Sequence, residues 1–508
     1  MAVQDSMMRE SAERDRNISP AAGNLPGSTV IIGAGPAGLS AGYELSKAGR
    51  PVCVLEKDPF QVGGLSRTIE FKQFRFDIGG HRFYSKNPAI ESLWTEILGD
   101  RMPVRKRLSR IYYRGRLFKY PLDPIDALRK LGLREAIACL ASYAFAPRRR
   151  ADQIRSFEDW VSAAFGRRLY RIFFKTYTER VWGMPCTEIS ADWAAQRIKG
   201  LSMAELVRRV FARRDTAPLI KTLIGAFRYP PHGPGEMWDE FARRIECQGG
   251  TVKLGQDVVA LRRAGGRLVS ITAKDGGQTR SYPASNFIST MPIRGLIEAL
   301  DPPPPAAVLE AARRLRYRDF LVVALVLDQE RLFPDQWIYV HDPGVRVARI
   351  QNFKNWSPEM VPDPRFTLVG LEYFCSDGDE DWAAKDDHLI ALASHELAAL
   401  GLAKQSQVVD GTVVRQRAAY PVYDRDYQAI VSQVRDFISR ELPNLQLVGR
   451  NGMHKYNNQD HAMMTGLMAA RNIMGASFDL WSVNSDAEYL EGERDGDSGL
   501  RMTPVRLS

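Results

Sequence analysis

Near its N-terminus the chain runs Thr29-Val30-Ile31-Ile32-Gly33-Ala34-Gly35-Pro36-Ala37-Gly38, an apolar stretch that leads directly into a glycine-rich turn. A helical pattern of apolar residues follows, and a second apolar run, Val52-Cys53-Val54-Leu55, ends at Glu56. The order is strand, glycine turn, helix, strand and acid, which is the fingerprint of a dinucleotide-binding unit. The stretch therefore predicts a Rossmann-type α/β domain.

Each residue type in this fingerprint has a physical reason. Gly33 makes the tight turn, Gly35 lets the backbone approach a pyrophosphate, and Gly38 lets the helix pack closely on the strand. The N-terminus of the helix directs its amides at the phosphates. Glu56 follows Gly33 by 23 residues, where its carboxylate can accept hydrogen bonds from ribose hydroxyls.

Two glycine pairs and a C-terminal helix favour FAD over NAD. Gly63-Gly64-Leu65-Ser66-Arg67 and Asp77-Ile78-Gly79-Gly80-His81 remove side chains where a wide, flat ring system must lie against the backbone. Near the C-terminus, Gly449-Arg450 ends a predicted strand and Asn458-Gln459-Asp460-His461 opens a predicted helix. The N-terminus of that helix can stabilise negative charge on a flavin by about 0.3 to 2 kcal/mol, depending on burial. The sequence therefore predicts FAD, active in its reduced form.

The predicted FAD contacts come from every part of this pattern. They are Gly33, Gly35, Ala37, Gly38, Glu56, Lys57, Gly63, Gly64, Leu65, Ser66, Gly80, His81, Val258, Gly449, Arg450, Asn458, Gln459 and Met463. NAD(P)H is a candidate external reductant, although the sequence contains no second nucleotide motif.

We expect a Rossmann-type FAD-binding domain with an inserted helical domain and a mostly antiparallel sheet domain for the substrate. The predicted boundaries are a disordered arm at 1–27, FAD-binding segments at 28–100, 226–300 and 413–484, a helical substrate domain at 101–225, a sheet-rich substrate domain at 301–412 and a tail at 485–508. Two strand-like runs, at 252–254 and 268–271, are expected to rejoin the first sheet.

Composition and charge narrow the class of protein. The 508 residues are 44% hydrophobic and 26% charged, which is the balance of a globular protein with more than one domain. The five cysteines stand far apart without a C-x-x-C pair, which argues against zinc and disulfides and fits a reducing cytoplasm. The net charge of +10 is divided among several arginine clusters, and we expect these to be solvated surfaces, with no nucleic-acid partner.

No run reaches the roughly 20 apolar residues that a transmembrane helix needs. The segment Ile137–Ala146, followed by Pro147 and three arginines, is interpreted as a buried helix end before a basic loop. Weak peripheral contact with a membrane surface is the alternative for this segment. The sequence does not indicate an oligomeric state.

Motifs over roughly residues 28–480 resemble those of UDP-galactopyranose mutases and occur in the same order. They are Gly79-Gly80-His81-Arg82-Phe83-Tyr84-Ser85, Lys119-Tyr120-Pro121, Val181-Trp182-Gly183-Met184-Pro185, Phe227-Arg228-Tyr229-Pro230, Ser289-Thr290-Met291 and Gly449-Arg450 through Asp460-His461. Protoporphyrinogen oxidases and flavin amine oxidases share only the first and last motifs. The resemblance implies a nucleotide-sugar mutase that interconverts pyranose and furanose forms, with N5 of reduced FAD attacking the anomeric carbon.

The same resemblance implies roles for individual residues. Arg197 and Arg349 match the arginine pair that binds the diphosphate, for which the planar guanidinium is suited, and His81 matches the histidine beside the flavin. The implied substrate contacts are Tyr120, Phe173, Trp337, Tyr339, Tyr420, Tyr456 and Asn458.

Three residues depart from the pattern of the eukaryotic mutases. Thr178, Trp356 and Asp123 stand in place of an asparagine, a tyrosine and a glutamine around the nucleotide and sugar. The nucleotide and the sugar therefore stay open. The alternative function is an FAD-dependent oxidoreductase of the amine oxidase or protoporphyrinogen oxidase type. A non-catalytic flavoprotein is a third option, with less support, since a structural cofactor needs no convergent phosphate-binding residues.

Overall fold

Five parallel strands form the central sheet of the dinucleotide-binding part, in the order β20-β13-β1-β2-β9. The computed structural model describes residues 27–484 except 121, 123, 147–152 and 192–224. The fingerprint strands β1 (Thr29–Ile32) and β2 (Val52–Leu55) pair in parallel, and β13 (Asn286–Ser289) lies on the other side of β1. The edges are β9 (Thr251–Lys253) and β20 (Leu445–Leu447). The predicted α/β fold is confirmed.

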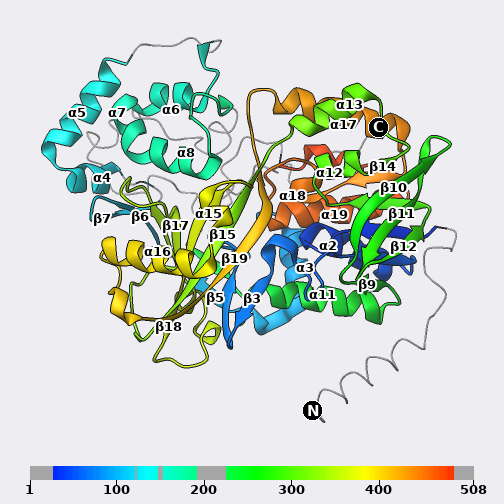
Figure 1. Ribbon diagram of the computed structural model, residues 1–508, viewed down its shortest axis with the longest axis horizontal. Helices are drawn as coiled ribbons and strands as arrows, with labels where there is room; N and C mark the ends of the chain where they lie inside the picture. The colour runs from blue at the N-terminus through cyan, green and yellow to red at the C-terminus, as the bar shows by residue number, and fades with distance from the viewer. Residues whose placement is uncertain (1–26, 121, 123, 147–152, 192–224, 485–508) are drawn as a thin grey trace.

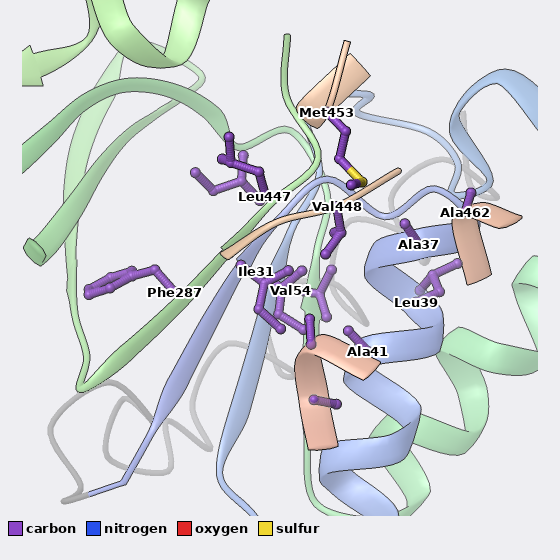
Figure 2. Close-up of a cluster of buried hydrophobic side chains, with 14 of the residues drawn as sticks. Ile31, Ala37, Leu39, Ala41, Val54, Phe287, Leu447, Val448, Met453 and Ala462 are labelled. Atoms are coloured by element: carbon purple, nitrogen blue, oxygen red, sulfur yellow. The ribbon is translucent and has the colours of Figure 1, made fainter. Parts of the chain in front are cut away.

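Helices α2 (Pro36–Lys47) and α19 (Gln459–Ile473) cover this sheet and bury its apolar strands. Figure 2 shows Ile31 and Val54 of the strands facing Leu39 and Ala41 of α2, while Phe287 points away from this helix. The two helices approach each other at Gly466, where an added Cβ would lie 2.0 Å from the carbonyl oxygen of Ala37. The small residue at this position therefore sets the distance between the two helices.

Replacing Gly466 by alanine is expected to destabilise the fold by about 3 kcal/mol or more, because the atom in the way is a backbone carbonyl that cannot rotate aside. Urea unfolding monitored by circular dichroism would measure the change. Gly295→Ala is the matched control, since a Cβ there meets only the methyl end of Met291 at 3.5 Å. It should be neutral or stabilising by up to about 1 kcal/mol. Equal stability of both variants would show that α2 and α19 are not held this closely.

A second, four-stranded sheet packs beside the first, in the order β12-β11-β10-β14. It consists of β10 (Asp257–Ala264), β11 (Arg267–Asp275), β12 (Gln278–Pro283) and the short β14 (Leu300–Asp301). The run predicted at 252–254 does join the central sheet through β9, but the run at 268–271 lies in β11 and does not. The prediction for 268–271 was wrong because β11 finds its hairpin partners β10 and β12 close by in sequence.

A seven-stranded sheet forms the other half of the molecule, in the order β19-β15-β18-β17-β16-β6-β7. Its strands are β6 (Ser109–Tyr113), β7 (Arg116–Lys119), β15 (Tyr317–Leu327), β16 (Trp337–Val340), β17 (Arg349–Asn352), β18 (Thr367–Cys375) and β19 (Val408–Pro421). All neighbours are antiparallel except β16 and β6. Strands β15 and β18 are almost continuously apolar because both faces of the sheet are covered.

A group of helices lies at one end of this sheet (Figure 1). It contains α4 (Pro124–Leu131), α5 (Leu133–Ala144), α6 (Phe157–Phe165), α7 (Arg167–Tyr170), a π-helical turn at Arg171–Lys175 and α8 (Thr176–Trp182). The segment predicted as helical, 101–225, thus also contributes β6 and β7 to the sheet. The predicted boundary at 412 falls inside β19. The domain boundaries themselves stay predictions.

The remaining elements connect these parts. They are α3 (Pro88–Leu98), β3 (Thr68–Phe71), β4 (Phe74–Asp77), β5 (Val104–Lys106), β8 (Ala226–Arg228), α11 (Gly235–Cys247), α12 (Ile293–Glu298), α13 (Ala306–Arg314), α14 (Phe353–Trp356), α15 (Glu380–Ala383), α16 (Asp386–Ala399), α17 (Tyr427–Glu441) and α18 (Gly449–Gly452). Within the described residues, no helix has both the length and the apolar character to cross a bilayer.

Candidate active site

The turn between β1 and α2 forms a cradle of backbone that fits a diphosphate. Gly33 has a φ of +93°, and its amide donates to the carbonyl of Leu55 at 2.7 Å. For a Cβ on Gly35, the nearest heavy atom outside the neighbouring residues would be the Cα of Gly64, at 3.8 Å. Helix α2 begins at this point without a side-chain cap or an acidic residue in its first turn, so its amides are available to an anion.

Glu56 lies beside this cradle, at the end of β2. Its two carboxylate oxygens accept the amides of Ala34 at 2.6 Å and Asp58 at 2.9 Å. Burial raises the pKa of Glu56, while these two hydrogen bonds stabilise the charged form. The carboxylate is thereby fixed in orientation at the place expected for a ribose. Lys57 is instead exposed and forms an ion pair with Asp257 at 3.1 Å, next to Val258 on β10.

A cavity of about 370 Å³ lies where the seven-stranded sheet, α8 and the flavin-binding motifs meet. It brings together thirteen of the residues predicted from the sequence. They are Leu65, Gly80, His81, Tyr120, Phe173, Trp337, Tyr339, Arg349, Tyr420, Arg450, Tyr456, Asn458 and Gln459. Thr178, one of the departures from the mutase pattern, also lines this cavity.

One wall of the cavity is built by the two glycine-rich motifs and the start of α19. The Ser66 hydroxyl donates to Oε1 of Gln459 at 3.1 Å, and Nε2 of Gln459 donates to the carbonyl of Arg82 at 2.8 Å. A Cβ on Gly80 would overlap the ring of Trp337, 1.6 Å from its Cζ3 atom. The indole therefore lies directly on this backbone. Because position 80 carries no side chain, a flat ring can lie against this backbone, and in this structure that ring is the indole of Trp337.

His81 is neutral at this wall. Its Nε2 lies 3.0 Å from the carbonyl of Ile78, so this nitrogen carries the proton and donates. Burial, together with the positive charges of Arg450 and Arg349, lowers the pKa of His81 to about 4.

Arg349 lies on the opposite wall and is one of the charged side chains that line the cavity. It is 7% exposed on β17 and forms an ion pair with Glu372, its direct neighbour across β18. Its Nη2 donates to the hydroxyl of Tyr420 at 3.0 Å. Burial lowers the pKa of Arg349, but Glu372 together with Tyr420 and Tyr177 outweighs burial and holds the pKa well above its ordinary value.

Aromatic rings cover the space between the two walls. Tyr339 stacks on Tyr120 at 4.4 Å between ring centres and on Trp337 at 5.6 Å. Tyr456 stacks on Tyr420 at 5.6 Å, and the guanidinium of Arg450 lies 4.8 Å from the Tyr456 ring. These rings form a shelf, an apolar aromatic surface with phenol hydroxyls at its edge. Such a surface suits a ligand that has both a ring and an anionic group.

The sequence did not lead to several residues of this site. Tyr177 and His341 stack at 4.8 Å with an angle of 5° and both line the cavity, where burial lowers the pKa of His341 to about 3. Tyr177 follows the π-helical turn, a feature common at functional sites that leaves no mark in the sequence. Glu372 carries a signal that could have found it, because it is a charged residue within the apolar run of β18.

Other predicted residues lie elsewhere. Arg197 and Asp123 are outside the described residues. Met463 is fully buried in α19, where its sulfur accepts the indole N–H of Trp94 at 3.1 Å. Trp356 does not line the cavity, because it is buried behind Trp337 at 6.1 Å and donates to the carbonyl of Gln336.

Stability is expected to fall in acid because three histidines are held neutral. Burial lowers the pKa of His81 and His454 to about 4 and that of His341 to about 3, whereas an unfolded histidine titrates near 6.5. Below about pH 6.5 the unfolded chain binds more protons than the folded protein. The free energy of unfolding therefore decreases as the pH is lowered, by up to about 1.4 kcal/mol per pH unit for each histidine.

Urea unfolding near neutrality and at about pH 5 would measure this loss. His454→Gln is the informative variant, because His454 donates to the carbonyl of Val422 outside the cavity and glutamine can also donate. It should reduce the pH dependence by the contribution of one histidine. A free energy that does not change over this range would contradict the burial of these three groups.

This chain is similar to several known proteins in sequence or in fold. Residues 36–474 match the family model of flavin containing amine oxidoreductases. The fold is similar to the crystal structure of a reduced UDP-galactopyranose mutase, with a TM-score of 0.76, 22% identity and coverage of 89% of this chain and 96% of that one. At this identity the likeness shows the fold alone.

The curated relatives match over shorter stretches. An L-amino-acid oxidase of Crotalus adamanteus is 32% identical over 119 residues, which are 20% of this chain and 22% of the oxidase. A phytoene dehydrogenase of Streptomyces griseus is 26% identical over 270 residues, which are 48% of this chain and 50% of that enzyme. The chain thus matches half or less of the length of these relatives.

Proposed function

We propose that this chain, which belongs to the flavin containing amine oxidoreductase family, is a flavin-dependent mutase that interconverts pyranose and furanose forms of a nucleotide sugar. The observation that carries the proposal is Arg349, a buried and permanently charged guanidinium beside two phenols. A simple amine or a hydrocarbon has no anionic group for this guanidinium to bind, whereas an amino acid has a carboxylate and a nucleotide sugar has a diphosphate. Of these anions, only the departing diphosphate gains negative charge during the reaction.

In this proposal one wall of the cavity holds the cofactor and the other holds the substrate. The cradle at Gly33, Gly35 and Gly64 and the carboxylate of Glu56 would hold FAD, with its ring on the Gly80 wall. Reduced FAD, when bound, supplies the nucleophile for the anomeric carbon. Burial, with a smaller contribution from the positive charges of Arg450 and Arg349, lowers the pKa of His81 and would keep the imidazole neutral beside the flavin.

On the opposite wall, Arg349 would bind the diphosphate and stabilise its charge as it leaves the sugar. The hydroxyl of Tyr420 accepts from Arg349, which leaves its own proton free to donate to a phosphate oxygen without adding charge. The shelf of Tyr120, Tyr339 and Trp337 would cover the sugar and exclude water from the anomeric carbon, which prevents hydrolysis.

The test is isomerisation by the reduced protein. Dithionite-reduced protein would be incubated without oxygen with UDP-galactopyranose and a panel of other nucleotide sugars, and the products separated by chromatography. We expect a furanose isomer from at least one sugar, and none from oxidised protein. Absence of any isomer, together with oxygen consumption on an amine, would replace the mutase by an oxidase.

The amine-oxidase alternative has its own support. The curated relatives named above are an amino-acid oxidase and a dehydrogenase, and the cavity is lined mainly by apolar and aromatic side chains. An oxidase would turn over without added reductant and would reduce oxygen, so the same incubation in air distinguishes the two reactions.

A further inference from the structure

Helix α5 exposes an apolar stripe at the outer edge of the molecule (Figure 1). Leu133, Ile137 and Leu140 follow the i, i+4, i+7 spacing of one helix face, with 77%, 56% and 37% of their surface exposed. Phe145, directly after the helix, is 88% exposed. The sequence interpretation of Ile137–Ala146 as a buried helix end was therefore wrong for this face. Only Ala136 and Cys139 of the helix are buried.

A basic cleft of about 850 Å³ adjoins this stripe. Helix α5 itself supplies part of the cleft through Ala138, Ala141 and Ser142, which lie on another side of the helix from the stripe, and Phe145 also lines the cleft. Six cations line the cleft against one carboxylate, Glu135. They are Arg114, Arg116, Lys130, Arg167, Arg168 and Arg171.

Three of these six cations are paired with carboxylates of the protein. Glu135 pairs with Arg168, Lys130 pairs with Asp126 at 2.7 Å, and Arg167 lies 3.8 Å from Glu158. Within the described part of the chain, no carboxylate lies at ion-pair distance from Arg171. An exposed apolar stripe beside uncompensated cations is costly for a free surface, and it is typical of proteins that bind a partner there.

We propose that this face docks on an anionic lipid bilayer. The stripe of Leu133, Ile137, Leu140 and Phe145 would enter the region between headgroups and acyl chains, and the cleft would bind the lipid phosphates. A second copy of the chain is a poorer occupant, because it would bring two cationic clefts together. The net charge of +10 acts in the same direction, since it attracts the whole protein to a negative surface.

Co-sedimentation with vesicles tests the proposal. The full chain would be mixed with vesicles of phosphatidylcholine alone and of phosphatidylcholine with phosphatidylglycerol. We expect binding to the anionic vesicles only, and weaker binding as salt screens the cleft. Ile137→Glu and Phe145→Glu should each weaken binding about tenfold or more, as expected from the loss of one buried apolar side chain. Arg171→Glu should weaken it about fivefold or more.

Two matched variants control for general effects of charge and of surface change. Phe60→Glu alters a phenylalanine that is equally exposed, at 88%, but lies beside the dinucleotide-binding sheet. Arg280→Glu reverses an exposed arginine on β12, at the opposite side of the molecule (Figure 1). Both should bind vesicles like the unchanged protein.

Three results would overturn the proposal. They are equal binding to neutral and anionic vesicles, binding that Phe145→Glu and Arg171→Glu leave unchanged, and no binding at all. If the protein binds no vesicles and light scattering shows a dimer that Phe145→Glu separates, the face is a contact between copies of the chain.

Discussion

Turnover of the Arg349→Ala variant is expected to fall by roughly 10³-fold or more, the effect of removing an arginine that stabilises a phosphoryl leaving group or transition state. FAD should stay bound, because Arg349 lies on the wall opposite the glycine motifs and its proposed partner is the substrate. Flavin absorbance per polypeptide and the rate of isomer formation would measure the two quantities separately.

The ion pair with Glu372 complicates this variant. Alanine at 349 would leave a fully buried carboxylate without its cation, which typically costs about 3 to 5 kcal/mol of stability. The double variant Arg349→Met with Glu372→Gln removes both charges together and keeps the volume, so it should fold and still lack activity. Loss of flavin from the double variant would show that Arg349 serves the cofactor and not the substrate.

Two further variants make the result specific. Tyr420→Phe removes only the hydroxyl that accepts from Arg349, and should lower turnover about 10- to 100-fold. Arg346→Ala is the matched control, because Arg346 lies three residues away and forms an exposed ion pair with Asp381 at 2.7 Å. It should leave the rate unchanged within about twofold. Full activity of Tyr420→Phe would contradict a role of the Arg349–Tyr420 pair in catalysis.

The dinucleotide-binding part could be predicted because its signal is local. Between Thr29 and Glu56 every step depends on residues next to one another, and the structure shows the strand, turn, helix and strand that they predict. The strands that complete this sheet come from distant segments. Nothing in the short run 445–447 indicates that β20 pairs with β13.

The strand order of the seven-stranded sheet and the stacking in the aromatic shelf could not be predicted, because they depend on pairing between strands that are far apart in the sequence. Strand β6 comes from a segment expected to be helical, and it joins β16 across more than 200 residues of chain. This pairing places Tyr339 over Tyr120, so two aromatics that are unremarkable alone become a shelf. Burial is equally hard to derive from composition, because the apolar residues of α5 have the pattern of a buried helix and yet face solvent.

Replacing Gly38 by alanine is expected to remove the flavin. A Cβ at this position would lie 1.9 Å from the carbonyl oxygen of Gly33, within the turn that forms the phosphate cradle. That carbonyl shares its peptide plane with the amide of Ala34, which donates to Glu56 at 2.6 Å, so it cannot rotate away without breaking this bond, and the start of α2 must move instead. FAD affinity should fall about 100-fold, which corresponds to the roughly 3 kcal/mol that overpacking of a rigid site costs.

The measurement is flavin bound per polypeptide after desalting, followed by FAD titration of the apoprotein. Gly42→Ala is the matched control in the same helix, because a Cβ there meets only the side-chain tips of Ile245 and Val54, at 3.0 and 3.1 Å. It should cost some stability and keep the flavin. If both variants lose flavin equally, the loss reflects general unfolding. If Gly38→Ala keeps it, the turn between β1 and α2 does not hold the diphosphate of FAD, and the assignment of the cofactor site would have to be changed.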